Sequence, residues 1–133
     1  MKTWLIAYFA TLVVFLAVDA IWLGAVASGW YRSAIGHLML DRPNFIAAAL
    51  FYAIYVVGIL VFAVMPGLQS GQWTEALVKG ALFGFFCYLT YDMTNLSTLK
   101  GWPLWIAALD TAWGTALTAT AASGGFFVAR RLI

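Results

Sequence analysis

The sequence predicts an all-α membrane protein, with four transmembrane helices in a compact bundle and a short interfacial helix between the first two. Two observations lead to this prediction. The chain is 65 % hydrophobic and only 9 % charged, whereas soluble domains carry about 25 % charged residues. It also holds four apolar runs of about 20 residues, the length that crosses the hydrocarbon core of a bilayer. These runs fill nearly all of the 133 residues, so we expect a single integral membrane domain.

The first apolar run, residues 3–27, is interpreted as a retained transmembrane helix. It follows Lys2 and carries Asp19 within it. The run is also longer than the apolar core of a cleaved signal peptide, which has about 7–15 residues. Length and the internal acid therefore favour a span over a leader.

The segment between the first two spans, residues 28–44, predicts a short interfacial helix. Helical spacing puts Tyr31, Ile35 and Leu38 on one face, while Arg32 and His37 lie mostly elsewhere. A short helix with one apolar and one polar face is typical of a segment that lies along the membrane surface.

The remaining spans are expected at 45–65, 76–96 and 103–128. The run Asp41-Arg42-Pro43-Asn44 precedes the second span and combines helix stop and start signals. The connection MPGLQSGQW at 65–73 is rich in turn-forming residues, and the connection around Lys100 and Gly101 is tight.

Four spans place both termini and the connection at 66–75 on one side of the membrane. Basic residues are slightly more numerous on this side, so the positive-inside rule predicts cytoplasmic termini. The difference is small and leaves a dual topology open. The residues compared are Lys2, Lys79, Arg130 and Arg131 on the side of the termini, and Arg32, Arg42 and Lys100 on the other.

Three acidic residues, Asp19, Asp92 and Asp110, lie inside predicted spans. Because a carboxylate at bilayer depth is costly, intramembrane acids are candidates for a functional site. Asp19 and Asp92 lie late in spans of the same direction, and Asp110 lies early in a span that runs back. All three are therefore expected in the half of the membrane next to residues 28–44. Burial and mutual repulsion disfavour ionisation of all three, so we expect at least one to keep its proton near neutral pH unless a cation is bound.

Aromatic residues accompany these acids at helical spacing. The segments LAVDAIWLG at 16–24 and AALDTAWGT at 107–115 both contain Asp-x-x-Trp, and residues three apart share a helix face. The sequence therefore predicts an acidic pocket with aromatic walls. Its expected substrate-binding or proton-carrying residues are Asp19, Trp22, Tyr88, Tyr91, Asp92, Asn95, Asp110 and Trp113, with Arg32, His37 and Lys100 as candidates for its mouth.

An alternative interpretation gives the acids a packing role. Polar side chains can hydrogen-bond across helices as glue, with Lys100 or Arg32 neutralising one of the acids. Close packing is expected in either case, because Gly80 and Gly84 form a small-residue face. The span at 103–128 is also rich in Ala, Thr, Ser and Gly.

Three segments together carry a family resemblance: LDRPN before the second span, YDMTNLSTLKGWP across the third connection and LDTAWGT in the last span. Over essentially its whole length, the chain resembles an uncharacterised family of small bacterial inner-membrane proteins, a domain-of-unknown-function family. The resemblance implies a four-span, multi-pass protein of the bacterial inner (plasma) membrane. It supplies no catalytic assignment.

The function best supported by the sequence is the binding or transport of a proton-coupled small cation. Carboxylates supply charge and exchange protons, and indole and phenol rings attract organic cations. No cofactor is evident, although the oxygens of Asp19, Asp92 and Asp110 would suit a hard divalent cation.

Two other functions stay open at this stage. One is a membrane-embedded enzyme acting on lipid headgroups or acyl chains, in which paired carboxyls act as acid and base. Gly-x-Ser-x-Gly and His-Glu-x-x-His motifs are absent, so no catalytic residue is assigned. The other is an accessory membrane subunit without chemistry of its own. Expected partners are the lipid bilayer, a small cation or lipid ligand, and a second copy or larger membrane complex; the scattered basic residues do not indicate nucleic acid.

Overall fold

The structure, a computed structural model, describes residues 1–133 and contains helices without strands. The prediction of an all-helical chain is confirmed. In order, the elements are α1 (Lys2–Ile21), η1 (Trp22–Val26), α2 (Ser28–Ile35), η2 (Gly36–Leu38), α3 (Phe45–Ile59), η3 (Leu60–Val64), α4 (Met65–Ser70), α5 (Trp73–Thr98) and α6 (Leu104–Leu132).

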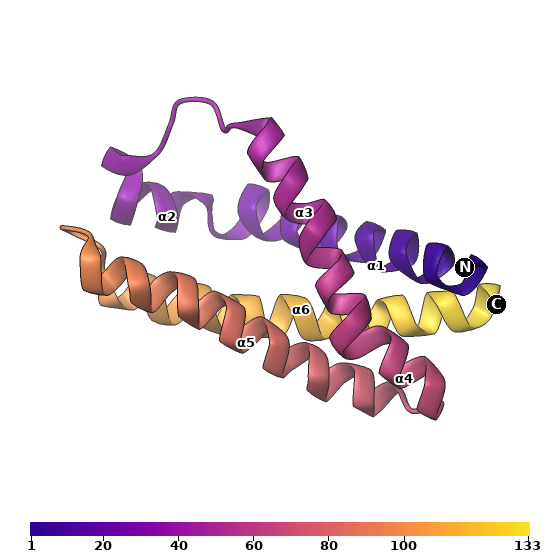
Figure 1. The fold of residues 1–133 in the computed structure, drawn as a ribbon. Helices are drawn as coiled ribbons and strands as arrows, with labels where there is room; N and C mark the ends of the chain where they lie inside the picture. Colours follow the sequence, from indigo (N-terminus) through magenta and orange to yellow (C-terminus); the bar gives the residue numbers. More distant parts are fainter.

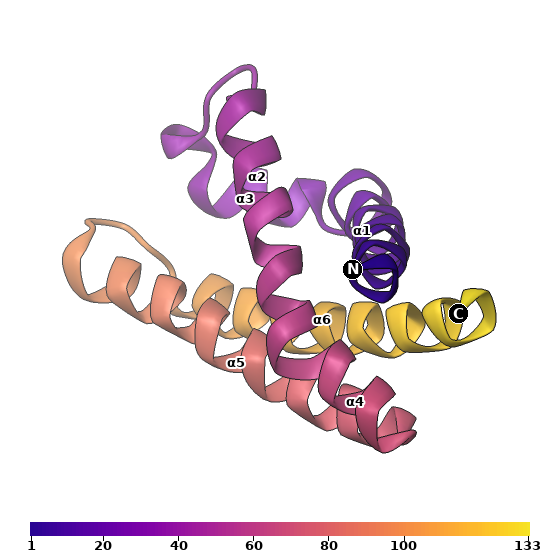
Figure 2. The same cartoon turned by 45° about the vertical axis from the view of Figure 1, so that its right-hand side comes forward.

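The helices run between two ends of the molecule. The N- and C-termini lie at one end together with α4, while α2 and the turn from α5 to α6 lie at the other (Figure 1). Helices α5 and α6 form an antiparallel hairpin, and α1 lies along α6. Helix α3 crosses this group obliquely, so that its N-terminal half diverges from α5 (Figure 2).

Two helical stretches are long and apolar enough to cross a membrane, Lys2–Val26 and Phe45–Ser70. The first combines α1 with η1, and the second combines α3, η3 and α4. Both contain a π-helical turn, η1 and η3, where one extra residue widens the helix. In η1 this turn begins at Trp22, the aromatic residue of the first Asp-x-x-Trp motif.

The turns between helices follow the signals in the sequence only in part, because Met65–Ser70, expected within a connection, continues the preceding helix as α4. Asn44 caps α3, because its side chain accepts a hydrogen bond of 3.1 Å from the backbone amide of Ala47. Gly71 and Gly101 adopt φ values of 74° and 76°, a backbone conformation that residues with a Cβ rarely adopt. These two glycines end α4 and turn the chain from α5 to α6.

Small residues bring α5 and α6 into direct backbone contact. A Cβ added to Gly80 would come within 2.7 Å of the Ala122 Cβ, and one added to Gly84 would overlap the Gly114 carbonyl and the Thr118 side chain. The small-residue face of α5 therefore packs on α6. Next to it, the large buried side chains of the core come from α1, α3 and α6: Phe15, Val56, Ile59, Leu117 and Phe126.

We expect Gly84→Ala to destabilise the fold by about 1–3 kcal/mol, the range for overpacking a tight interface. The matched control is Gly24→Ala, because an added Cβ at Gly24 meets nothing within 4 Å. Reversible unfolding of the detergent-purified protein measures both variants. Equal stability of the two variants would contradict the close contact of α5 with α6.

Candidate functional site

The buried carboxyl group of Asp19 connects three helices. Asp19 lies near the end of α1 and is 8 % exposed. Its Oδ2 accepts a hydrogen bond of 2.7 Å from the Tyr52 hydroxyl of α3, and its Oδ1 accepts one of 3.3 Å from Trp113 Nε1 of α6. Both carboxylate oxygens are therefore satisfied by long-range partners.

The two Asp-x-x-Trp motifs meet through their indole rings. Trp22 and Trp113 stack with ring centroids 4.3 Å apart and planes 8° from parallel. Trp22 Nε1 donates a hydrogen bond of 3.4 Å to the Tyr31 hydroxyl, which in turn donates one of 2.8 Å to Asp110 Oδ1. Each indole is thus connected by hydrogen bonds to the aspartate of the other motif. Trp113 donates directly to Asp19, and Trp22 donates to Tyr31, which donates to Asp110. The antiparallel course of α1 and α6 explains this crossed arrangement.

Helix α2 contributes Tyr31 because its apolar face packs on the start of α6. Tyr31, Ala34 and Ile35 lie against a small cluster of Trp102, Ile106 and Ala107. Burial, followed by the charge of the neighbouring Asp110 carboxylate, raises the pKa of the Tyr31 hydroxyl above its ordinary value. The Tyr31 hydroxyl therefore keeps its proton at physiological pH and acts as a neutral donor to Asp110.

A second group of polar atoms, around Asp92, has no hydrogen-bond partners. Asp92 of α5 is 0 % exposed, and neither of its carboxyl oxygens makes a hydrogen bond. The buried Trp102 Nε1 and Thr111 Oγ1 are also without partners. Asp110, Trp102 and Thr111 are the polar neighbours of Asp92. Such a cluster is unusual, because buried polar groups in folded proteins are nearly always paired.

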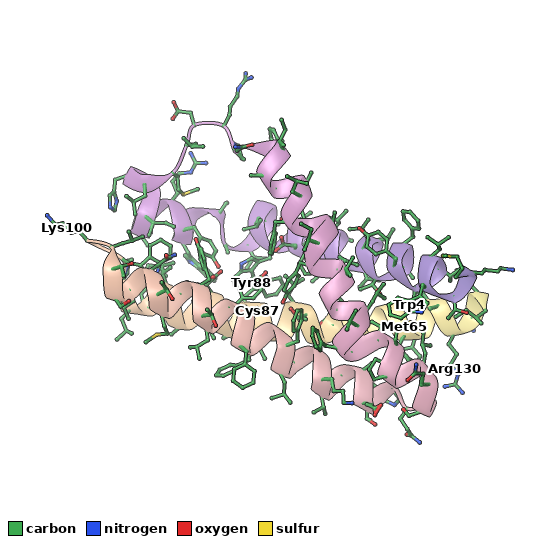
Figure 3. The ribbon with its side chains drawn as sticks, viewed as in Figure 1. Trp4, Met65, Cys87, Tyr88, Lys100 and Arg130 are labelled. Atoms are coloured by element: carbon green, nitrogen blue, oxygen red, sulfur yellow. The ribbon has the colours of Figure 1, made fainter.

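An aromatic pocket of about 540 Å³ lies between α3, α5 and α6. Its lining residues are Phe51, Tyr55, Cys87, Tyr88, Tyr91 and Asp110. Asp110 is the single charged residue among them. Figure 3 shows Cys87 and Tyr88 in the opening where α3 diverges from α5. The Tyr55 and Tyr88 rings lie edge to face with centroids 6.1 Å apart, and Gly114 of α6 leaves the space that the Tyr88 ring occupies.

The structure gathers most of the residues that the sequence singled out, in two linked groups. Asp19, Trp22, Trp113 and Asp110 are joined by the hydrogen bonds and the stack described above, while Tyr88 and Tyr91 line the pocket with Asp110. Asn95 is partly buried beside Tyr91. The residues expected at the mouth, Arg32, His37 and Lys100, are all exposed.

No basic side chain neutralises the buried acids. The one ion pair in the structure joins Lys79 to Glu75 at 3.6 Å, within α5 and near its first turn. Neither Lys100 nor Arg32 pairs with Asp19, Asp92 or Asp110, so this part of the packing alternative has no support. The structure also contains no group of three or more His, Cys, Asp or Glu side chains able to hold a metal ion.

Sequence reasoning missed the contribution of α3 and of two donors near Asp92. Tyr52 and Tyr55 are one helical turn apart in an apolar run without acids, and Trp102 follows the turn glycine. A usable signal was present, because a phenol hydroxyl or indole N–H inside an apolar segment needs a partner when buried. Thr111, next to Asp110, gave no signal of its own.

The family comparison assigns the chain to a family of predicted membrane proteins. The family model described as "Predicted membrane protein (DUF2177)" matches residues 4–127. The chain belongs to this family. The resemblance to an uncharacterised membrane-protein family is thereby confirmed, and the family description supplies a membrane location but no activity. No curated protein and no solved structure matches the chain.

We expect Tyr52→Phe to lower the free energy of unfolding by about 1.5–3 kcal/mol, the value of a hydrogen bond to a charged group. Tyr8→Phe is the matched control, because the Tyr8 hydroxyl also joins α1 to α3 but donates to the neutral Ala53 carbonyl at 3.0 Å. Its loss should cost about 0.5–1.5 kcal/mol. Unfolding of both variants in detergent tests the difference; a larger loss for Tyr8→Phe would contradict the stronger hydrogen bond to Asp19.

Proposed function

We propose that the protein binds a small organic cation in the pocket between α3, α5 and α6. The observation that carries this proposal is the lining of the pocket: four aromatic side chains, Cys87, and one carboxyl group, that of Asp110. Aromatic ring faces attract quaternary and primary ammonium groups, most strongly where water is excluded. A carboxylate beside such rings supplies the countercharge.

The chemistry of the lining favours an organic cation over a metal ion. A hard metal ion would need several oxygen ligands around one point, and no group of acidic, His or Cys side chains offers them. Trp22 and Trp113, which stack on each other, do not line this pocket. The aromatic side chains of the lining are those of Phe51, Tyr55, Tyr88 and Tyr91. The Tyr55 ring stacks on both Phe51 and Phe83, so we propose that the cation contacts Tyr88 and Tyr91.

We further propose that the chain crosses the bacterial inner membrane four times as a compact bundle, with its termini in the cytoplasm. The antiparallel hairpin of α5 and α6 and the gathering of α4 with both termini at one end support this arrangement (Figure 1). In that orientation the pocket lies within the membrane, so that a bound cation exchanged for a proton could be transported across it.

The alternative functions receive less support from the geometry. A lipid-directed enzyme would need an activated nucleophile or an acid and base around a substrate, and His37 is exposed in η2 and does not line the pocket. An accessory subunit would need the acids only for packing. The unpartnered carboxyl of Asp92 contributes no hydrogen bond to such packing.

If the pocket binds a cation, the protein should distinguish a charged ligand from an uncharged ligand of the same shape. Choline should raise the melting temperature of the purified protein by mass action, whereas its uncharged isostere 3,3-dimethylbutan-1-ol should not. Asp110→Asn should weaken choline binding by about tenfold or more, a loss of at least about 1.4 kcal/mol. Asp41→Asn, at an exposed position outside the pocket, is the control and should bind like the parent. Equal responses to both ligands, or a change in stability alone in Asp110→Asn, would contradict cation binding.

The transport part of the proposal is tested in vesicles. Protein reconstituted into liposomes with an imposed pH gradient should drive uptake of radiolabelled choline, and uptake should fall to the protein-free level in Asp110→Asn. Binding in detergent without any gradient-dependent uptake would restrict the function to binding.

A further inference from the structure

We infer that Asp92 is the proton-holding residue of this protein, and that its carboxylic acid shares this proton with the neighbouring Asp110 carboxylate behind the cation pocket. The inference rests on the proposed cation site for its coupling role. The position of the proton itself can be tested without any cation.

The environment of the Asp92 side chain disfavours a negative charge on its carboxyl group. Asp92 is fully buried and its two oxygens lack hydrogen bonds, while the equally intramembrane Asp19 has a donor on each oxygen. A carboxylate without donors or countercharge is among the most costly groups to bury. A neutral carboxylic acid removes most of this cost, because it is uncharged and has a proton to donate.

The groups that face Asp92 supply no positive charge to stabilise a carboxylate. The titratable neighbours are Asp110 from α6, Tyr31 from α2 and Tyr91 from α5. None of them carries a positive charge, and no Lys, Arg or His makes an ion pair with Asp92. Trp102 Nε1 and Thr111 Oγ1 are unpartnered buried groups beside it, and a small shift in either would let it donate to the same carboxyl group.

Asp110 belongs both to the hydrogen-bonded chain that includes Tyr31 and to the polar group around Asp92. Its Oδ1 accepts a hydrogen bond from Tyr31, its side chain lines the pocket, and it neighbours Asp92. With Asp92 protonated, the pair carries one negative charge. When a monovalent cation binds at Asp110, the Asp92 proton leaves to water and the pair takes a second negative charge, so the total charge of the occupied site stays constant. Proton and cation thereby compete for the same pair of carboxyl groups.

Infrared spectroscopy of the full-length protein in detergent tests where the proton resides. At neutral pH the parent should show the carbonyl band of a protonated carboxylic acid, shifted in heavy water. The band should vanish in Asp92→Asn and persist in Asp19→Asn. Absence of the band from the parent, or its persistence in Asp92→Asn, would overturn the inference.

A milder variant covers the case in which Asp92→Asn does not fold. Trp102→Phe removes the indole N–H beside Asp92 and should shift the frequency of the band, because hydrogen bonding alters a carbonyl stretch. Trp30→Phe is the control, since Trp30 is exposed in α2 and should leave the band unchanged. A band with the same frequency in both variants would show that the proton lies elsewhere.

The coupling role is tested by the pH dependence of choline binding. Competition predicts that affinity rises about tenfold per pH unit over the range in which the pair holds its proton, and that this slope flattens in Asp92→Asn. The slope persisting in Asp92→Asn would overturn the coupling role. If choline does not bind the parent at all, the proposed function fails, while the infrared result still decides the position of the proton.

Discussion

Carboxyl groups inside an apolar helical structure need hydrogen-bond donors, and this need determines how the helices of the protein meet. Water is not available to satisfy polar groups within a bilayer. The donors to Asp19 come from α3 and α6, and the donor to Asp110 comes from α2. The hydrogen bonds of these two acids thus connect α1, α2, α3 and α6.

The stack of Trp22 on Trp113 links the two acids through Tyr31, and the surroundings of the two acids differ. Asp19 lies on the side where both of its oxygens are bonded, and it is well suited to hold helices together. Asp110 retains contact with an open, aromatic pocket and with the buried Asp92. The structure therefore contains one acid with a donor on each oxygen and a neighbouring pair of acids beside the pocket. The hydrogen bonds of Asp19 fit the packing interpretation of the sequence, whereas the functional interpretation, proposed above for Asp92 and Asp110, stays a prediction.

The helical class and the convergence of the acids could be predicted from the sequence, because both follow from local periodicity. The spacing Asp-x-x-Trp places the acid and the indole on one helix face. The direction of each apolar run then determines at which end of the helical bundle they lie. The crossed pairing of the motifs could not be predicted, since it depends on the register between α1 and α6. That register is determined by small residues, such as Gly125 against Thr11, whose fit exists only in three dimensions.

The pocket wall was the largest omission of the sequence-based account. Phe51 and Tyr55 line the pocket but lie in an apolar run that contains no acid, where aromatic residues are ordinary lipid-facing side chains. Their role arises from the oblique crossing of α3, which no local pattern encodes. Asn95, predicted as a site residue from its place three residues after Asp92, is partly buried beside Tyr91, which lines the pocket.

The most direct test of the account is to locate a bound cation. Crystals of the protein grown with trimethylselenonium, a small cation with an anomalous scatterer, would reveal its position without any assumption about activity. We predict a selenium peak between the Asp110 carboxylate and the rings of Tyr88 and Tyr91. A peak confined to the protein surface, or an empty pocket at a saturating concentration of the cation, would contradict it.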